Sequence, residues 1–243
     1  MDASTYQQMR DLEDHHWWFE GRRRIISHLL TSLDLPDSAR VLEVGCGTGG
    51  NMTMLQKFGE LTCIEQDEQA RSLANKRHLA EVMPGSLPAD LPRMDKEFDL
   101  IALFDVIEHV KDDRASLLNL SGMLAPGGRI VVTVPAFPFL WSQHDEENQH
   151  FRRYRRKDIL SLTNACGLKT DYVSYFNFWL FPPVAAVRLI RKLLPYEESW
   201  KDMRLPAKPI NSLFRRLFGS ERFMIPKWSL PWGISLAAVM RNS

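Results

Sequence analysis

Four glycines follow a short apolar run near residue 40, in the stretch Val-Leu-Glu-Val-Gly-Cys-Gly-Thr-Gly-Gly-Asn at 41–51. Glycine lets a backbone adopt tight turns and approach a ligand closely. A helix that begins after such a loop offers free N–H groups and the positive end of its dipole. Gly45, Gly47 and Gly50 also match the dinucleotide pattern GxGxxG, which is weak evidence when it stands alone. This stretch predicts a binding site for a nucleotide-type ligand.

An acidic residue follows at the distance that such a site requires. Glu65 comes twenty residues after Gly45, at the end of an apolar run over 61–65 that predicts the next strand. A carboxylate at this place can accept hydrogen bonds from both hydroxyls of an adenosine ribose. That role fits NAD and S-adenosylmethionine (SAM) equally. A solvent-facing carboxylate is the plainer alternative, but the glycine loop upstream argues against it.

Three further features distinguish between the two ligands. Glu43 stands two residues before the first glycine, the run Phe-Asp-Val-Ile-Glu-His-Val occupies 104–110, and Leu-Ala-Pro-Gly-Gly-Arg-Ile occupies 124–130. In this order and spacing the set resembles the motifs of class I SAM-dependent methyltransferases, over about residues 40–135. The chain as a whole resembles the bacterial type 11 and type 23 methyltransferase families.

The resemblance implies a fold, an activity and a cofactor. The fold is an α/β, Rossmann-like, doubly wound one with a seven-stranded, mostly parallel sheet whose last strand is antiparallel. The activity is methyl transfer from SAM. At the adenine loop the sequence departs from many relatives, which carry Asp where Ser86 stands. The residues implied to bind SAM are Glu43, Gly45, Gly47, Gly49, Glu65, Gln66, Ser86, Leu87 and Asp105.

Histidines supply the candidate catalytic groups. Methyl transfer is an in-line displacement, so the enzyme mainly has to align the acceptor atom with the methyl group. If the acceptor is a hydroxyl, a base with a pKa near neutrality helps to remove its proton. His109 is the first candidate for that base, and its alternative role is structural, at the start of a helix. His144 and His150, further along the chain, are the other two candidates.

A metal site is a second interpretation of the same region. Asp105, Glu108 and His109 form a DxxEH run. It resembles the ExxEH run with which some small-molecule and RNA methyltransferases hold a divalent ion, and carboxylate and imidazole ligands suit such ions. The first residue here is Asp rather than Glu, and in class I enzymes the run commonly borders SAM. We therefore expect no metal and keep this triad as the alternative.

The acceptor site is predicted in the segment 137–156, which follows the predicted strand at 129–134. Ligands of open α/β sheets bind at the carboxyl ends of the strands. The segment combines aromatic residues, two histidines and four arginines, and the arginine guanidinium matches phosphate or carboxylate groups. A solvated basic loop that pairs with the acidic residues 145–147 is the alternative. The predicted substrate-binding residues are Trp141, Arg152, Arg153 and Tyr154.

Alternating apolar strands and helices must position these residues. Such alternation predicts βαβ units and a largely parallel sheet. Two helices are predicted before it, at 5–20 and 22–33, and an irregular region at 196–228. The predicted strands lie at 41–44, 61–65, 98–104, 129–134, 168–176 and 234–240, and the later helices at 51–58, 68–80, 112–124, 157–165 and 183–194. We divide the chain into an N-terminal helical lid (1–36), a SAM-binding core (37–181), a helical cap with the acceptor region (182–228) and the final strand (229–243).

Composition excludes several classes of partner. The net charge is +1, which gives no reason to expect nucleic acid. Cys46, Cys63 and Cys166 form no CxxC pair, so a reducing, cytoplasmic setting is expected. No apolar run reaches the length of about 20 residues that a membrane-spanning helix needs. The amphipathic helix at 183–194 indicates peripheral membrane contact or a lipid-linked acceptor, and packing on the sheet or on a second copy is the plainer alternative.

The expected function is methyl transfer from SAM to an oxygen, rather than a nitrogen, of a small or lipid-linked anionic acceptor. An NAD-dependent oxidoreductase could use the same glycine loop, but the chain has no recognisable Tyr-x-x-x-Lys pair for hydride transfer. A SAM-binding module without catalysis is the third interpretation.

Overall fold

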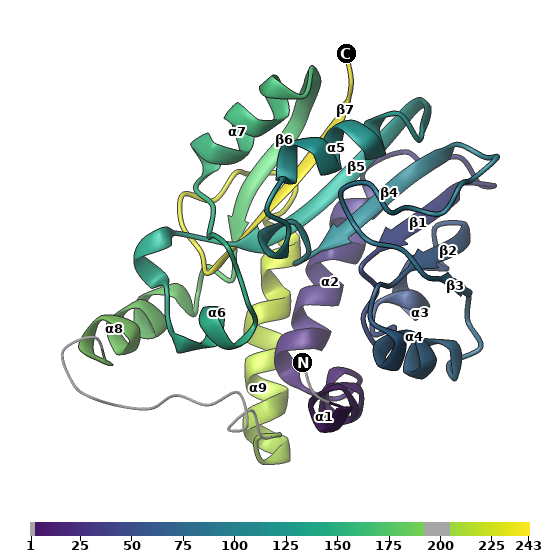
Figure 1. The fold of residues 1–243 in the computed structure, drawn as a ribbon. Helices are drawn as coiled ribbons and strands as arrows, with labels where there is room; N and C mark the ends of the chain where they lie inside the picture. Colours follow the sequence, from purple (N-terminus) through teal and green to yellow (C-terminus); the bar gives the residue numbers. More distant parts are fainter. Residues whose placement is uncertain (1–2, 192–204) are drawn as a thin grey trace.

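The computed structural model describes residues 3–191 and 205–243. Its centre is a seven-stranded sheet with the order β3-β2-β1-β4-β5-β7-β6. The first five strands run parallel, and β7 is antiparallel to both β5 and β6. This topology confirms the predicted doubly wound sheet (Figure 1). The strands are β1 (Arg40–Val44), β2 (Glu60–Ile64), β3 (Glu81–Met83), β4 (Phe98–Phe104), β5 (Leu124–Pro135), β6 (Leu168–Phe176) and β7 (Ser235–Asn242).

Helices cover both faces of the sheet, and each face has its own apolar core. The cluster on one face joins residues of α2, α3 and α9 to the sheet, and the cluster on the other joins α5 and α7 to it. The sequence of a strand that is covered on both sides is a continuous apolar run. For this reason β4 was predicted with its observed bounds. The helices are α1 (Ala3–Glu13), α2 (Trp17–Thr31), α3 (Met52–Leu55), α4 (Glu68–Asn75), α5 (Asp113–Ser121), α6 (Gln143–Glu147), α7 (Arg156–Ala165), α8 (Phe181–Arg191) and α9 (Lys208–Gly219).

The two N-terminal helices are present, but the break between them was predicted in the wrong place. It falls at residues 14–16 rather than at Gly21, because the imidazole of His16 caps α2 by accepting a hydrogen bond from the Trp18 N–H at 3.3 Å. Gly21 lies inside α2, where a Cβ would come within 2.6 Å of the Phe218 ring. The glycine therefore permits the close approach of α2 and α9, which lie side by side (Figure 1).

Several other predicted elements differ from the structure. The helix predicted at 51–58 is reduced to the four residues of α3. The region 196–228, predicted to be irregular, contains α9, whose residue Phe218 is fully buried. The helix predicted at 183–194 begins earlier, at Phe181, and its predicted end lies outside the described residues.

The predicted lid and cap segments pack against each other. The side chain of Asn211 in α9 accepts a hydrogen bond from the Trp17 N–H at 2.8 Å and donates one to the His15 carbonyl oxygen at 2.8 Å. In the described parts of the chain, no helix is long and apolar enough to cross a membrane.

Candidate active site

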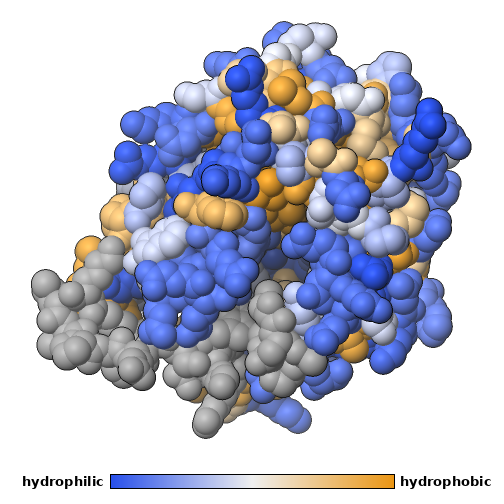
Figure 2. All heavy atoms as spheres, viewed as in Figure 1, coloured by the Kyte–Doolittle hydropathy of each residue, from blue (hydrophilic) through white to orange (hydrophobic). Residues whose placement is uncertain are grey.

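A cavity of about 1190 Å³ lies at the carboxyl ends of the parallel strands. Val44, Phe104 and Pro135 line it, and they are the last residues of β1, β4 and β5. Helices α1 and α2, the glycine loop, the segment after β4 and the loop after β5 complete the wall. Figure 2 shows a hollow near the centre of this face, surrounded mainly by hydrophilic residues. Ligands of open α/β sheets bind at such an edge.

The glycine loop has a backbone that only glycine adopts easily. Gly45 and Gly47 both line the cavity, with φ angles of +74° and +56°. A Cβ at Gly45 would come within 2.7 Å of the Val106 side chain, whereas a Cβ at Gly47 would meet nothing within 4 Å. Space therefore remains open beside Gly47, as the close approach of a nucleoside requires.

Glu65 is buried beside this loop with its carboxylate held in place. One oxygen accepts the Gly47 N–H at 2.7 Å, and the other accepts the Asp67 N–H at 2.9 Å. Burial raises the pKa of Glu65. Tyr6 of α1 lies opposite, and burial together with Asp67 and Glu65 raises the pKa of its hydroxyl. Other predicted cofactor residues in this wall are Gln66, Ser86, Leu87 and Asp105.

Two predicted cofactor residues do not line the cavity. Glu43 is buried behind the loop, where it accepts a hydrogen bond from the Asn51 amide at 3.0 Å. Burial raises the pKa of Glu43 to about 8. Gly49 has a φ angle of +86°, and a Cβ there would come within 2.8 Å of the Arg77 side chain. Both residues therefore shape the loop from behind.

The position of Glu43 predicts a specific pH dependence of stability. Its pKa rises from an ordinary value of 4.5 to about 8 in the fold, so the folded protein binds this proton more tightly than the unfolded chain does. The stabilisation is fully present below about pH 4.5 and is lost as the pH rises to about 8. Compared with Glu43→Gln, the wild type should lose about 1.4 kcal/mol of unfolding free energy for each pH unit in this window. Urea unfolding of both proteins at several pH values measures the difference, and Glu68→Gln, a substitution at an exposed position that leaves Glu43 in place, should keep the pH dependence of the wild type.

Asp105 is held by a residue that the sequence reasoning missed. It has a φ angle of +57°, and its carboxylate pairs with the buried Arg22 guanidinium at 2.8 Å. Arg22 also donates to the Thr133 hydroxyl at 2.7 Å and lies over the Trp18 ring, 5.2 Å from its centroid. These contacts connect α2 to the ends of β4 and β5. The predicted helix contained Arg22, but no pattern in the neighbouring sequence identifies Asp105 as its partner, because Asp105 lies far along the chain.

Helix α1 is fastened over the glycine loop by Glu13, which the sequence reasoning also missed. The Glu13 side chain is buried and accepts hydrogen bonds from the Thr48 hydroxyl at 2.7 Å and from Arg77 at 2.5 Å. Arg23 donates to the backbone carbonyl of Glu13 at 2.6 Å and to that of Gly50 at 3.2 Å. The Glu13 carboxylate therefore joins three segments that are distant in the sequence, and Arg23 connects the backbone of α1 to that of the glycine loop.

The three histidines predicted as catalytic lie together in the cavity wall. The ring centroids of His109 and His150 are 4.6 Å apart, and those of His144 and His150 are 6.4 Å apart. Burial lowers the pKa of both His109 and His144 to about 4. Near neutral pH these two rings are therefore uncharged, and each has a nitrogen lone pair.

A buried carboxylate fixes the loop that carries His150. Asp145 is fully buried and accepts hydrogen bonds from His150 Nδ1 at 2.8 Å, Arg153 Nε at 2.8 Å and the Ser142 N–H at 2.9 Å. Although burial alone would raise it, the bonds from His150 and Arg153 hold the pKa of Asp145 well below its usual range. Arg153 also donates to the carbonyl oxygen of Ala136 at 3.1 Å. This network orients the imidazole of His150.

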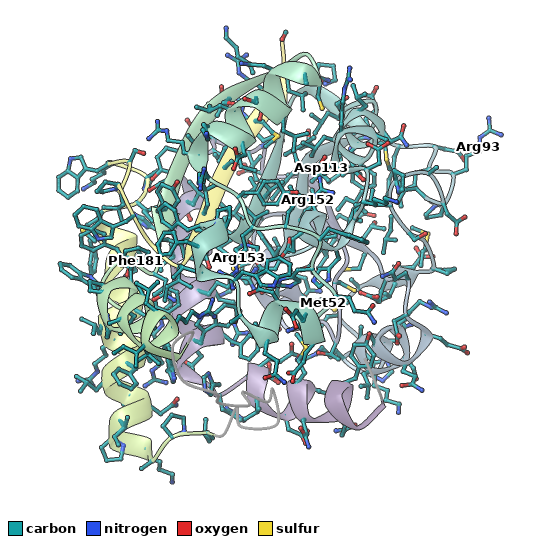
Figure 3. The ribbon with its side chains drawn as sticks, turned by 60° about the vertical axis from the view of Figure 1, so that its left-hand side comes forward. Met52, Arg93, Asp113, Arg152, Arg153 and Phe181 are labelled. Carbon is teal, nitrogen blue, oxygen red and sulfur yellow. The ribbon has the colours of Figure 1, made fainter. Side chains whose placement is uncertain are left out.

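The structure places the four predicted substrate-binding residues in different surroundings. Only Arg153 of the four lines the cavity. Arg152 pairs with Asp113 at 2.9 Å, and the Tyr154 hydroxyl donates to the same carboxylate at 2.8 Å. Figure 3 shows Arg152 beside Asp113. Trp141 donates to the exposed Glu146 at 3.3 Å. A different cation, Arg188 of α8, lies in the wall instead.

The structure brings together only two of the three residues of the alternative metal site predicted from the sequence. Asp105 is engaged by Arg22. Glu108 and His109 do lie together, and His150 takes the third place in their cluster. Burial and the neighbouring Asp105 raise the pKa of Glu108 well above its ordinary value.

Comparisons with known proteins agree with this geometry. A family model described as a methyltransferase domain matches residues 16–173. An "uncharacterized methyltransferase" of Staphylococcus carnosus is 27% identical over 154 residues, which are 62% of this chain and 70% of the relative. A "probable S-adenosylmethionine-dependent methyltransferase" of Mycobacterium tuberculosis is 28% identical over 127 residues, which are 51% of this chain and 45% of the relative. The chain thus spans less than half the length of that second protein.

Among solved structures, a chain from the complex that contains the Haloferax volcanii Trm112 methyltransferase activator superposes with a TM-score of 0.63 at 15% identity, over 97% of this chain and 94% of the other. At that identity the likeness concerns the fold.

The fold and the site define a class I SAM-dependent methyltransferase. The chain belongs to the methyltransferase domain family whose model covers residues 16–173. Its cofactor is SAM, so the NAD-dependent oxidoreductase alternative is not supported.

Proposed function

We propose that this methyltransferase transfers the methyl group of SAM to an oxygen atom of a small or lipid-linked anionic acceptor. The observation that carries the proposal is the continuity of the cavity. Gly47 and Glu65 line this cavity, and the three histidines and Arg188 line it as well. A cofactor beside the glycine loop and an acceptor beside the histidines would therefore share one enclosed space.

The chain's own residues supply binding and alignment. SAM, when bound, supplies an electrophilic methyl group on a sulfonium. Glu65 is placed to accept the ribose hydroxyls, and the open space beside Gly47 admits the nucleoside. At the other end, an uncharged imidazole such as His144 can take the proton of an acceptor hydroxyl. The O–H bond then breaks as the oxygen–methyl bond forms and the sulfur–methyl bond is lost, which leaves S-adenosylhomocysteine.

Charge at the acceptor end supports an anionic group on the acceptor. Arg188 reaches the cavity wall from α8, and its guanidinium also donates to the Leu140 carbonyl oxygen at 2.6 Å. A guanidinium carries five N–H donors in a fixed, planar arrangement that matches carboxylate and phosphate groups. Bonds of this kind to carboxylate or phosphate are among the stronger ones in proteins.

Apolar residues next to Arg188 support a lipid-linked acceptor and peripheral membrane contact. Leu189 and Ile190, which follow Arg188 in α8, are 49% and 55% exposed. Exposed apolar side chains beside cations are typical of helices that lie at a membrane surface.

Incubation with SAM and pools of candidate acceptors tests the proposal directly. We expect one acceptor class to gain a methyl group by mass spectrometry, with formation of S-adenosylhomocysteine. Release of methanol by mild alkali identifies a methyl ester, and isotope-labelled methyl groups distinguish ethers from amines by their NMR shifts. Methylation of nitrogen alone, or turnover only with uncharged acceptors, would overturn the corresponding part of the proposal.

Arg188 gives the matched variant pair. Arg188→Gln should raise the acceptor KM by about 10-fold or more, because a charged hydrogen bond is worth about 1.5–3 kcal/mol, while the Kd for SAM stays the same. Arg152→Gln should leave both unchanged, since Arg152 lies outside the cavity wall. Equal effects of the two substitutions would show that Arg188 does not contact the acceptor.

A further inference from the structure

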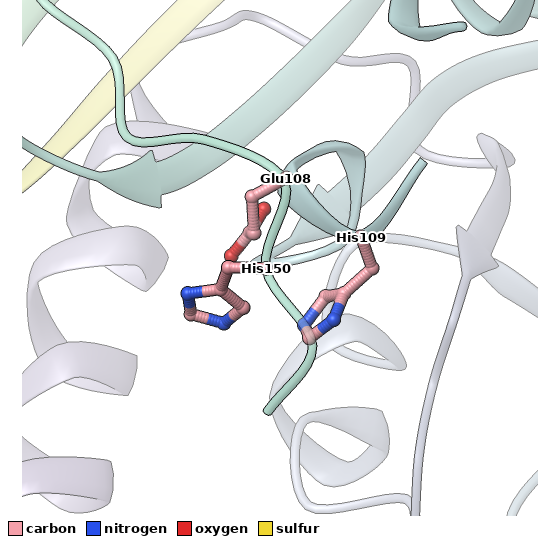
Figure 4. Close-up of side chains that lie close together, drawn as sticks. All are labelled: Glu108, His109 and His150. Carbon is pink, nitrogen blue, oxygen red and sulfur yellow. The ribbon is translucent and has the colours of Figure 1, made fainter. Parts of the chain in front are cut away.

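We propose that Glu108, His109 and His150 bind one divalent transition-metal ion at the acceptor end of the cavity. One ligand atom from each side chain lies within 4.8 Å of the other two. Figure 4 shows the two imidazoles and the carboxylate grouped together, from the segment after β4 and from the loop after β5. All three residues line the cavity.

The carboxyl group of Glu108 is the strongest sign that a ligand is missing from its surroundings. Its side chain is fully buried, and neither of its oxygens has a hydrogen-bond partner among the described residues. Leaving a buried polar group without a partner carries a free-energy cost, which is larger for a charged group. Two nearby arginines do not relieve this cost, because Arg22 is bonded to Asp105 and Arg153 to Asp145. A cation bound by Glu108 would remove it.

Both imidazoles are already oriented as ligands. His150 Nδ1 pairs with the buried Asp145 carboxylate at 2.8 Å, which leaves Nε2 as the nitrogen that can bind a metal. The His109 ring bonds the backbone carbonyl of Asn148, which leaves its second nitrogen. A histidine that binds a metal almost always donates its other N–H to a carboxylate or a backbone carbonyl. The cluster shows one example of each arrangement.

The donor set defines the class of ion. Two imidazoles and one carboxylate suit zinc, iron, manganese or cobalt, whereas calcium and magnesium prefer oxygen ligands. Bonds of about 2.0–2.2 Å place ligand atoms about 3–4 Å apart. The observed separations therefore require the side chains to close by about 1 Å, which is within the range of small side-chain rotations.

Three protein ligands leave coordination positions for an acceptor oxygen or water, as in catalytic metal sites. This assignment deepens the function proposed above and rests on it for the identity of the acceptor. An acceptor hydroxyl bound to the ion loses its proton more easily, and the ion fixes the oxygen close to the histidines. His144 lies outside the triad, lines the same cavity, and is the group that we assign to receive that proton. The inference replaces our expectation, from the sequence, that the site holds no metal.

Metal binding can be measured without SAM or an acceptor. Metal-free protein is titrated with Co²⁺, Zn²⁺ and Mn²⁺ by calorimetry, and Co²⁺ binding is followed by its visible absorption. We expect one equivalent to bind. Glu108→Gln and His109→Asn should each weaken binding by about 100-fold or more, as loss of a direct ligand exceeds the 10–100-fold typical of its supporting residues. Thermal unfolding of each variant checks that it is folded.

Two histidines serve as controls. His144→Asn changes a histidine that lines the same cavity but lies outside the triad, and His28→Asn removes an exposed histidine of α2. Both should bind the ion as the wild type does. Absence of stoichiometric binding, or binding that survives both Glu108→Gln and His109→Asn, overturns the proposal. If the ion binds at the triad but no acceptor oxygen is methylated, the metal site stands and the proposed function fails.

Discussion

Replacing Asp145 by alanine is expected to lower the free energy of unfolding by about 3–5 kcal/mol, because it leaves a buried cation without its partner. The Arg153 side chain is 3% exposed, and its Nε bonds Asp145 at 2.8 Å. His150 and the Ser142 N–H lose the same acceptor. For a protein of this size each kcal/mol shifts the melting temperature by about 2–4 °C, so a decrease between about 6 and 20 °C should appear in thermal unfolding.

The neighbouring Glu146 provides the control for this experiment. It lies in the same helix, is exposed, and contacts only the Trp141 indole among the hydrogen bonds described. Glu146→Ala should change stability by no more than about 0.5 kcal/mol. A loss below about 1 kcal/mol in Asp145→Ala would mean that Arg153 can turn to solvent, and that the network does not hold the histidine loop.

The second large effect is expected at Gly47, in SAM binding rather than in stability. A methyl group there would occupy the open space that the loop leaves beside Glu65. We expect Gly47→Ala to raise the Kd for SAM by about 100-fold, which corresponds to about 2.7 kcal/mol. Calorimetry with SAM and with S-adenosylhomocysteine measures the change.

Gly127 is a matched control for the conformational cost of placing alanine at a positive φ angle. It also has a positive φ angle, of +81°, and a Cβ there would likewise meet nothing within 4 Å, but it lies outside the cavity wall. Gly127→Ala should therefore carry a comparable conformational cost and leave the Kd for SAM unchanged. If the two variants bind SAM equally well, the cofactor does not approach the backbone at Gly47.

The elements that depend on local sequence were predictable. The apolar run of β4 and the glycine turn before α3 are encoded within a few residues, and the motif resemblance implied a mostly parallel sheet with an antiparallel last strand. Helix α9 was missed even though its apolar residues have helical spacing, because the surrounding basic and aromatic residues suggested an irregular segment. The break at His16 was misplaced because Gly21 resembles a helix terminator, whereas its role is to accommodate Phe218.

The contacts that depend on distant residues could not be predicted. Arg22 meets Asp105, and Glu13 meets Arg77, only because the folded sheet brings their elements together. The arginines of the loop after β5 are adjacent in sequence and chemically identical, yet Arg152 bonds Asp113 outside the cavity while Arg153 is buried against Asp145. Only the path of the backbone decides which of them turns inward. The same holds for His150, whose partners Glu108 and His109 are about forty residues away.

Helix α1 has a consequence for the kinetics of the enzyme, because it forms part of the cavity wall through Tyr6 and Met9 and is fastened by Glu13. A molecule bound against that wall and the glycine loop stabilises the docking of the first helix by linkage, about 2.7 kcal/mol when its concentration is 100 times its Kd. Linkage is reciprocal, so undocking of the helix weakens the binding of the same molecule. In enzymes with such covers the departure of product often limits turnover. We therefore expect undocking of α1 to form part of the release of S-adenosylhomocysteine after each cycle.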